Sequence, residues 1–105
     1  MDNDKRKHKC GSGCCLLVDR FEGALSDFAD ETVVDVYDTK RSAIREVKCR
    51  VHDLEKFHKD DFDASEIPPF PSDDDIVSTL ERVGILKYVS GDGCKYTWQI
   101  ILNIR

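Results

Sequence analysis

Long apolar runs are missing from this chain of 105 residues. A helix that spans a bilayer needs roughly 20 consecutive apolar residues, and no stretch of the sequence approaches that length. The basic N-terminal residues also lack the apolar segment that a secretory signal peptide requires. We therefore expect no membrane contact and an intracellular, reducing location.

The cysteine pattern does not support a disulfide framework. The sequence has five cysteines, an odd number, and three of them are Cys10, Cys14 and Cys15. With His8, these three could supply the four ligands of a tetrahedral zinc site. Adjacent cysteines are awkward ligands, however, and the spacing is not repeated later in the chain. Reduced thiols are the favoured interpretation, and no metal is expected.

Motifs for catalysis are also missing. The sequence contains neither a glycine-rich phosphate loop nor a recognisable nucleophile motif. His52 and Asp53 suggest acid–base chemistry, but adjacent side chains on a helix point in different directions. We expect neither an enzyme nor a bound cofactor.

The charge is distributed unevenly along the chain. The net charge is −5, which taken alone argues against a nucleic-acid partner. Residues 40–59, however, carry seven basic and three acidic groups, whereas residues 60–75 carry seven acids and no base. A polyanion responds to charges within about 8–10 Å, so the local charge matters more than the total. Residues 40–59 are the best candidates for nucleic-acid contact, the alternative being a solvated helix face.

The apolar periodicity predicts a short series of elements. Residues 1–13 read as a disordered basic arm and residues 14–105 as one domain. Within that domain we expect a helix over 14–28, a strand over 32–37, helical structure over 40–57, an acidic proline-rich loop over 58–75, a helix from Ser72 to Gly84, and strands over 85–89 and 95–102. Over 40–57 the periodicity does not locate a turn, so one continuous helix stays open beside two. The order predicts an α+β winged helix-turn-helix, with three helices and a C-terminal β-hairpin wing.

Short segments in this order resemble the DNA-binding domain of the E-two-factor (adenovirus E-two promoter-binding factor) and DP cell-cycle transcription factors. The resemblance covers residues 14–102. Its segments are Leu16-Leu17-x-x-Arg20-Phe21-x-x-x-Leu25, Val33-Val34-Asp35-Val36, Lys48-Cys49-Arg50-Val51-His52-Asp53-Leu54, Asp75-Ile76-x-x-x-Leu80-Glu81-x-x-Gly84-Ile85-Leu86 and Lys95-Tyr96-Thr97-Trp98.

The resemblance implies sequence-specific binding of double-stranded DNA at a GC-rich site, in transcription regulation of the cell-cycle type in the nucleus. Lys48 and Arg50 would approach base edges in the major groove, because the third segment resembles the family's base-reading signature. Phosphate contacts would come from Lys40, Arg41, Arg45 and Lys95. By the same analogy, a related winged-helix protein is expected as a dimer partner.

Two departures from the family pattern favour an alternative. Cys49 stands where the family has the first of two paired arginines, and the acidic insertion at 58–75 splits the recognition helix. A bidentate arginine–guanine contact supplies about 1–3 kcal/mol of discrimination, so losing one of two weakens or alters the preference. The alternative is a winged-helix protein–protein interaction module that has lost DNA binding.

Overall fold

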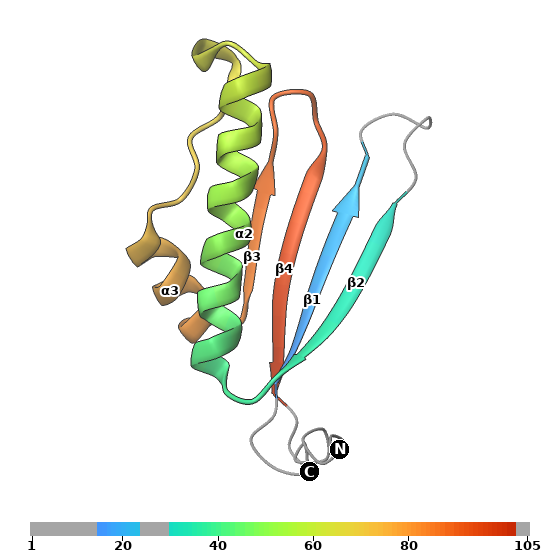
Figure 1. Cartoon of the computed structure of the whole chain (residues 1–105), viewed down its shortest axis with the longest axis vertical. Coiled ribbons are helices and arrows are strands. Elements are labelled where there is room, and N and C mark those ends of the chain that lie inside the picture. The colour runs from blue at the N-terminus through green and yellow to red at the C-terminus, as the bar shows by residue number, and fades with distance from the viewer. Residues whose placement is uncertain (1–14, 24–29, 103–105) are drawn as a thin grey trace, which may run out of the picture.

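The computed structural model describes residues 15–23 and 30–102 (Figure 1). The predicted arm over 1–13 lies outside the described residues. The described part contains four strands, two α-helices and one turn of 3-10 helix. In chain order they are β1 (Cys15–Glu22), β2 (Glu31–Tyr37), α2 (Lys40–Asp61), η2 (Ala64–Glu66), α3 (Asp73–Arg82), β3 (Ile85–Val89) and β4 (Lys95–Leu102). Neither helix is long and apolar enough, over the residues described, to cross a membrane.

The four strands form one antiparallel sheet in the order β2-β1-β4-β3. Cys15 pairs with Tyr37 on one side and with Leu102 on the other, which sets the register of the three longer strands. Because side chains alternate between the faces of a strand, one face carries Leu17, Trp98 and Ile100, which are buried. We call this the inner face. The opposite face carries residues such as Leu16, Val34 and Ile101, and we call it the open face.

Both helices supply side chains to the core on the inner face. Helix α2 begins at Thr39, whose side-chain oxygen accepts a hydrogen bond from the backbone N–H of Ser42 at 3.0 Å. Helix α3 begins in the same way at Ser72. Seven core side chains are fully buried, and burying each of the larger ones contributes about 1.5–3 kcal/mol. They are Leu17, Ala43, Val47, Val51, Ile76, Leu80 and, at 1% exposure, Cys15.

The winged-helix prediction is wrong. The described residues contain two α-helices and a four-stranded sheet, whereas a winged helix has three helices and a hairpin wing. The error begins at residues 15–22, which were expected to be helical and form the central strand β1. The spacing of four between Leu17 and Phe21 fits a helical turn, but four is also an even number and therefore fits the period of two of a strand. Because β1 pairs with β4, the hairpin of β3 and β4 that was expected to form the wing is part of the sheet.

The other predicted elements agree better with the structure. The strand over 32–37, the helix from Ser72 and the strands over 85–89 and 95–102 are present to within a few residues. Residues 40–61 form one continuous helix, which settles the alternative left open by the periodicity. The expected loop at 58–75 is shorter than predicted, because its first four residues extend α2.

Aromatic side chains pack the connection between α2 and α3 against the sheet. Phe70 stacks on Tyr88 with ring centroids 4.0 Å apart, and the Tyr88 hydroxyl donates a hydrogen bond to the carbonyl oxygen of Pro68 at 2.7 Å. His58, near the end of α2, is buried against Phe70 and Tyr96. The acidic, proline-rich segment therefore packs on the body of the protein.

Candidate functional site

The structure separates the six predicted DNA-binding residues. Arg41, Arg45 and Lys48 lie on the outer side of α2, three or four positions apart. Lys40 reaches the carbonyl oxygen of Glu81 at 3.3 Å, near the end of α3. Lys95 is on the open face of the sheet, which is turned away from the helices. The sixth residue, Arg50, faces the sheet. The structure brings three of the six together and does not bring the other three to the same surface.

Arg50 lies at the centre of a cluster of carboxylates between α2 and the first two strands. Each kind of guanidinium nitrogen donates a hydrogen bond of 2.9 Å: Nε to Glu46, Nη1 to Asp19 and Nη2 to Asp35. Nη2 also contacts the Tyr37 hydroxyl at 3.4 Å. The predicted role for Arg50 was to donate hydrogen bonds to a guanine. In the structure these donors are already engaged within the protein.

The cluster changes the ionisation of Arg50 in a direction that keeps it charged. Partial burial disfavours the charged guanidinium, but the hydrogen bonds to Asp35, Glu46 and Asp19 outweigh burial and raise the pKa of Arg50. One positive charge is shared by three carboxylates, so the cluster as a whole remains negative. Glu46 lies four residues before Arg50, and this i,i+4 spacing was the one signal in the sequence for the ion pair.

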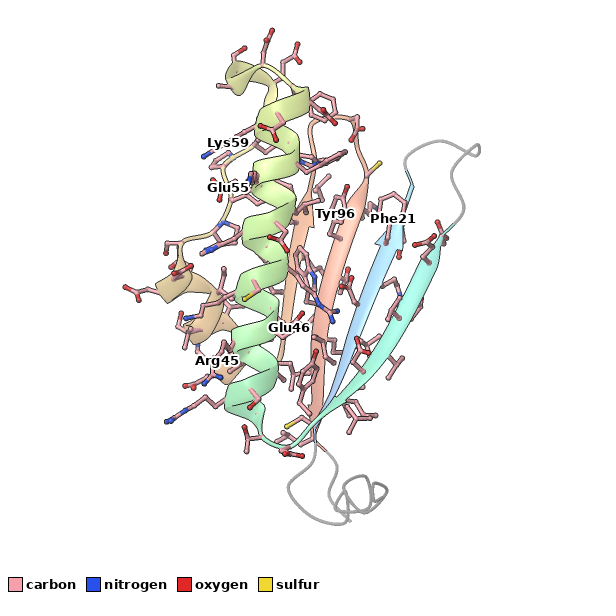
Figure 2. All side chains as sticks on the ribbon, in the orientation of Figure 1. Phe21, Arg45, Glu46, Glu55, Lys59 and Tyr96 are labelled. Carbon is pink, nitrogen blue, oxygen red and sulfur yellow. The ribbon has the colours of Figure 1, made fainter. Side chains whose placement is uncertain are left out.

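The outer side of α2 carries a row of cations that we call the basic stripe. From Arg41 to Lys59 the row advances by three or four residues at each step, over a length of about 27 Å at 1.5 Å per residue. Its members are Arg41, Arg45, Lys48, Lys56 and Lys59, with His52 at the middle of the row. Figure 2 shows Arg45 and Lys59 projecting from the side of α2 opposite to Glu46. Lys56 and Lys59 were not among the predicted residues, although their spacing continues the row.

Acidic groups lie beside the basic stripe. Lys59 forms an ion pair with Glu55 at 3.2 Å, and His52 Nε2 is 2.6 Å from a carboxylate oxygen of Asp73. Asp73 is the first of three aspartates in the first turn of α3, where negative charge suits the helix dipole. The stripe is therefore exposed along α2 except at Lys48, which is half-buried, and it is bordered by acid near its middle.

A groove runs along the other side of α2. Helices α2 and α3 lie toward the β3–β4 half of the sheet, and Figure 1 shows β1 and β2 extending beyond them. The space between α2 and β1 is a shallow, largely open depression of about 420 Å³, which we call the aromatic groove. It is lined by Asp19, Phe21, Arg50, Asp53, Leu54, Phe57, Tyr96 and Trp98.

Aromatic rings form the floor and part of the rim of the aromatic groove. The rings of Phe21 and Tyr96 lie on neighbouring strands (Figure 2), with centroids 5.2 Å apart. Tyr96 stacks against Trp98, with centroids 6.3 Å apart. Burial raises the pKa of the Tyr96 phenol to about 12. Phe57, on α2, is 55% exposed, which is high for so large an apolar side chain. Trp98 also belongs to the core, at 3% exposure. The sequence gives no signal for the hollow, because only the position of α2 on the sheet creates it.

The proposed zinc ligands are divided between the two parts of the chain. His8, Cys10 and Cys14 lie outside the described residues. Cys15 is buried in the core at 1% exposure, and burial raises the pKa of its thiol, which keeps it protonated. Over the residues that the structure describes, no group of three or more metal-ligating side chains gathers in a geometry for a metal ion.

Over residues 15–23 and 30–102 the chain is a small α+β domain, in which two helices pack on one face of a four-stranded antiparallel sheet, toward its β3–β4 half. Comparisons with protein-family models, with curated proteins and with solved structures find no match for the chain.

Proposed function

We propose that the chain is a protein-interaction module that binds a basic, partly apolar peptide segment of another protein in the aromatic groove. The observation that carries this proposal is the concave surface beside α2, which combines an aromatic floor with a rim of carboxylates. Binding sites in proteins are typically concave and apolar, with a few charged groups that select the ligand.

The charge of the aromatic groove favours a cationic partner. Among the described residues, Arg50 is the one cation that lines it, and three carboxylates already neutralise this charge. Asp53 is exposed on the rim and adds a further negative charge. A lysine or arginine of a bound peptide can pair with Asp53 and also lie over the ring of Tyr96, because aromatic faces attract cations.

The half-exposed Phe57 favours a peptide with apolar residues as well. An amphipathic segment that lies in the groove would cover this ring and remove apolar surface from water. Complete burial of a phenylalanine side chain contributes about 1.5–3 kcal/mol. Covering the exposed half therefore contributes about 1 kcal/mol to peptide binding.

Trp98 provides the experiment, because it is the single tryptophan of the sequence and forms part of the groove. We expect its fluorescence to change on titration with a basic amphipathic peptide, and to change little with a peptide of the same apolar pattern carrying glutamate in place of lysine. Phe57→Ala should weaken binding of the basic peptide about five- to tenfold.

Phe62→Ala is the matched control, because Phe62 is 41% exposed and follows the same helix but lines a different hollow. This variant should bind the basic peptide as the wild type does. Equal affinity for the basic and acidic peptides, or equal losses in the two phenylalanine variants, would contradict the proposal.

The basic stripe favours a second candidate function, which is sequence-independent binding of double-stranded nucleic acid through phosphates. Five cations along about 27 Å of one helix side can follow a phosphate backbone. Base reading by Arg50 is not part of this candidate, because its donors are engaged with Asp19, Asp35 and Glu46.

Salt dependence tests the second candidate. The logarithm of the binding constant should fall with the logarithm of salt concentration at a slope of about −0.9 per phosphate neutralised. The double variant Arg45→Glu/Lys48→Glu should lose binding to GC-rich and AT-rich duplexes alike, whereas Asp53→Asn should not weaken it. A wild-type chain that binds no duplex at low salt would remove this candidate and leave the groove proposal unaffected.

A further inference from the structure

Among the residues that the structure describes, strand β2 presents an open hydrogen-bonding edge. It lies at the end of the sheet and pairs with β1 on one side. Figure 1 shows β2 at the edge away from α3 and, along most of its length, away from α2. A further strand added beside β2 would therefore extend the sheet without meeting a helix.

The sequence of β2 has only part of the usual protection of an edge strand: it carries two acids, Glu31 and Asp35, and Asp35 is already paired with Arg50. Natural edges are commonly short, or carry lysine, proline or a bulge, which prevents pairing with another chain. β2 has seven residues, Glu-Thr-Val-Val-Asp-Val-Tyr, with no lysine or proline, and Val33, Val34 and Val36 are each more than 50% exposed. The opposite edge strand, β3, has five residues and carries Lys87 at its centre.

We propose that β2 pairs antiparallel with β2 of a second copy of the chain, with Val34 opposite Val34 at the two-fold axis. This inference is independent of the proposed groove function. The interface is isologous, so it closes as a dimer and leaves no further β2 edge free.

The charges of β2 and the number of residues that can pair select this register. A two-fold axis perpendicular to the sheet keeps both open faces on one side. Residues directly opposite each other then point to the same face, so the axis must lie between the two strands at the level of one residue. An axis at Val33 would place Glu31 opposite Asp35, and an axis at Asp35 would place two Asp35 side chains opposite each other. Like charges directly opposite are destabilising. An axis at Val34 pairs all seven residues of each strand and places no acid opposite an acid.

The same register joins the apolar surfaces of the two open faces. Within one copy, Val36, Leu16 and Ile101 lie in one row across the sheet, and Val34 and Val18 lie in the next. Pairing at Val34 brings the two copies of this row into contact at the Val34 side chains. Val34 and Val36 of both β2 strands then share the open face of one continuous eight-stranded sheet.

A charge-exchange experiment tests both the interface and its register. By sedimentation velocity across micromolar to millimolar concentrations, we expect the wild type to dimerise. Val34→Lys and Val34→Glu should each weaken dimerisation by at least about tenfold, because like charges meet at the axis. An equimolar mixture of these two variants should recover the dimer, since opposite charges then face each other.

Val89→Lys is the matched control, because Val89 is 50% exposed against 53% for Val34 and lies on the open face of the opposite edge strand. It should dimerise as the wild type does. A wild type that stays monomeric throughout, a mixture that does not recover the dimer, or a loss of dimer in Val89→Lys equal to that in Val34→Lys would overturn the proposal.

Discussion

Both long sides of α2 carry an arginine, but one arginine is exposed to solvent and the other is paired with carboxylates. On the outer side, Arg45 belongs to the basic stripe and is exposed to solvent. On the side of the aromatic groove, Arg50 is held by three carboxylates and its side chain is 23% exposed. The two arginines are five positions apart, which turns one away from the other by about 140° around the helix axis. An arginine in a basic segment is therefore a ligand-binding residue or a structural one according to the side of the helix on which it falls.

The largest expected difference between the two sides is in stability. Arg50→Gln leaves three carboxylates close together without their cation, and we expect it to lower the free energy of unfolding by about 2–3 kcal/mol, below the range for a fully buried pair because the groups are partly exposed. Arg45→Gln, on the outer side, should change it by less than about 0.5 kcal/mol. Urea unfolding followed by circular dichroism measures both. Similar losses in the two variants would show that Arg50 has no special structural role.

A pH titration tests the burial of the groove floor. The pKa of Tyr96 rises from its ordinary value of 10.0 to about 12, so the unfolded chain loses this proton first as the pH rises. The free energy of unfolding should therefore fall between pH 10 and 12, and Tyr96→Phe should remove about 1–2 kcal/mol of that fall. Urea unfolding at several alkaline pH values measures the slope. An unchanged slope in Tyr96→Phe would place the phenol in contact with solvent.

Acids on α2 should differ in their effect on a bound basic peptide. Asp53 lies on the rim of the aromatic groove, whereas Asp60 is exposed farther along the helix and outside the lining. Asp53→Asn should weaken peptide binding by about two- to fivefold, as expected for loss of one exposed ion pair, and Asp60→Asn should leave it unchanged. Trp98 fluorescence at low and moderate salt measures the difference. A larger effect from Asp60→Asn would argue for general attraction by the acidic chain.

The smallest expected effect lies in the basic stripe. Lys59 and Glu55 form an i,i+4 ion pair at 3.2 Å, with the lysine side chain 64% exposed. Lys59→Gln should lower the free energy of unfolding by about 0.3 kcal/mol at low salt, and this loss should disappear at high salt. Thermal unfolding at two salt concentrations is sensitive enough for the comparison. A loss as large as that of Arg50→Gln would erase the distinction between the two sides of α2.

Local patterns in the sequence were sufficient for the elements that depend on near neighbours. The Thr39 and Ser72 helix caps, the apolar row along α2 and the hairpin of β3 and β4 all follow from contacts within a few residues. The conformation of residues 15–22, in contrast, depends on pairing with other strands. Their spacing satisfied a helix and a strand equally, and pairing with both β2 and β4 decided for the strand. A central strand is specified by both of its partners, and one of them, β4, lies at the other end of the chain.

The sequence alone therefore determined which residues are apolar, where α2 and α3 begin, and that positive charge gathers over residues 40–59. Only the tertiary structure decided which of those charges reach solvent, because that depends on how α2 lies across the sheet. It placed Arg50 among carboxylates from β1 and β2, and it left Phe57, Tyr96 and Trp98 around a hollow. The reason is physical: an amphipathic pattern defines a helix side, but the neighbour that each side meets is set by contacts between distant segments.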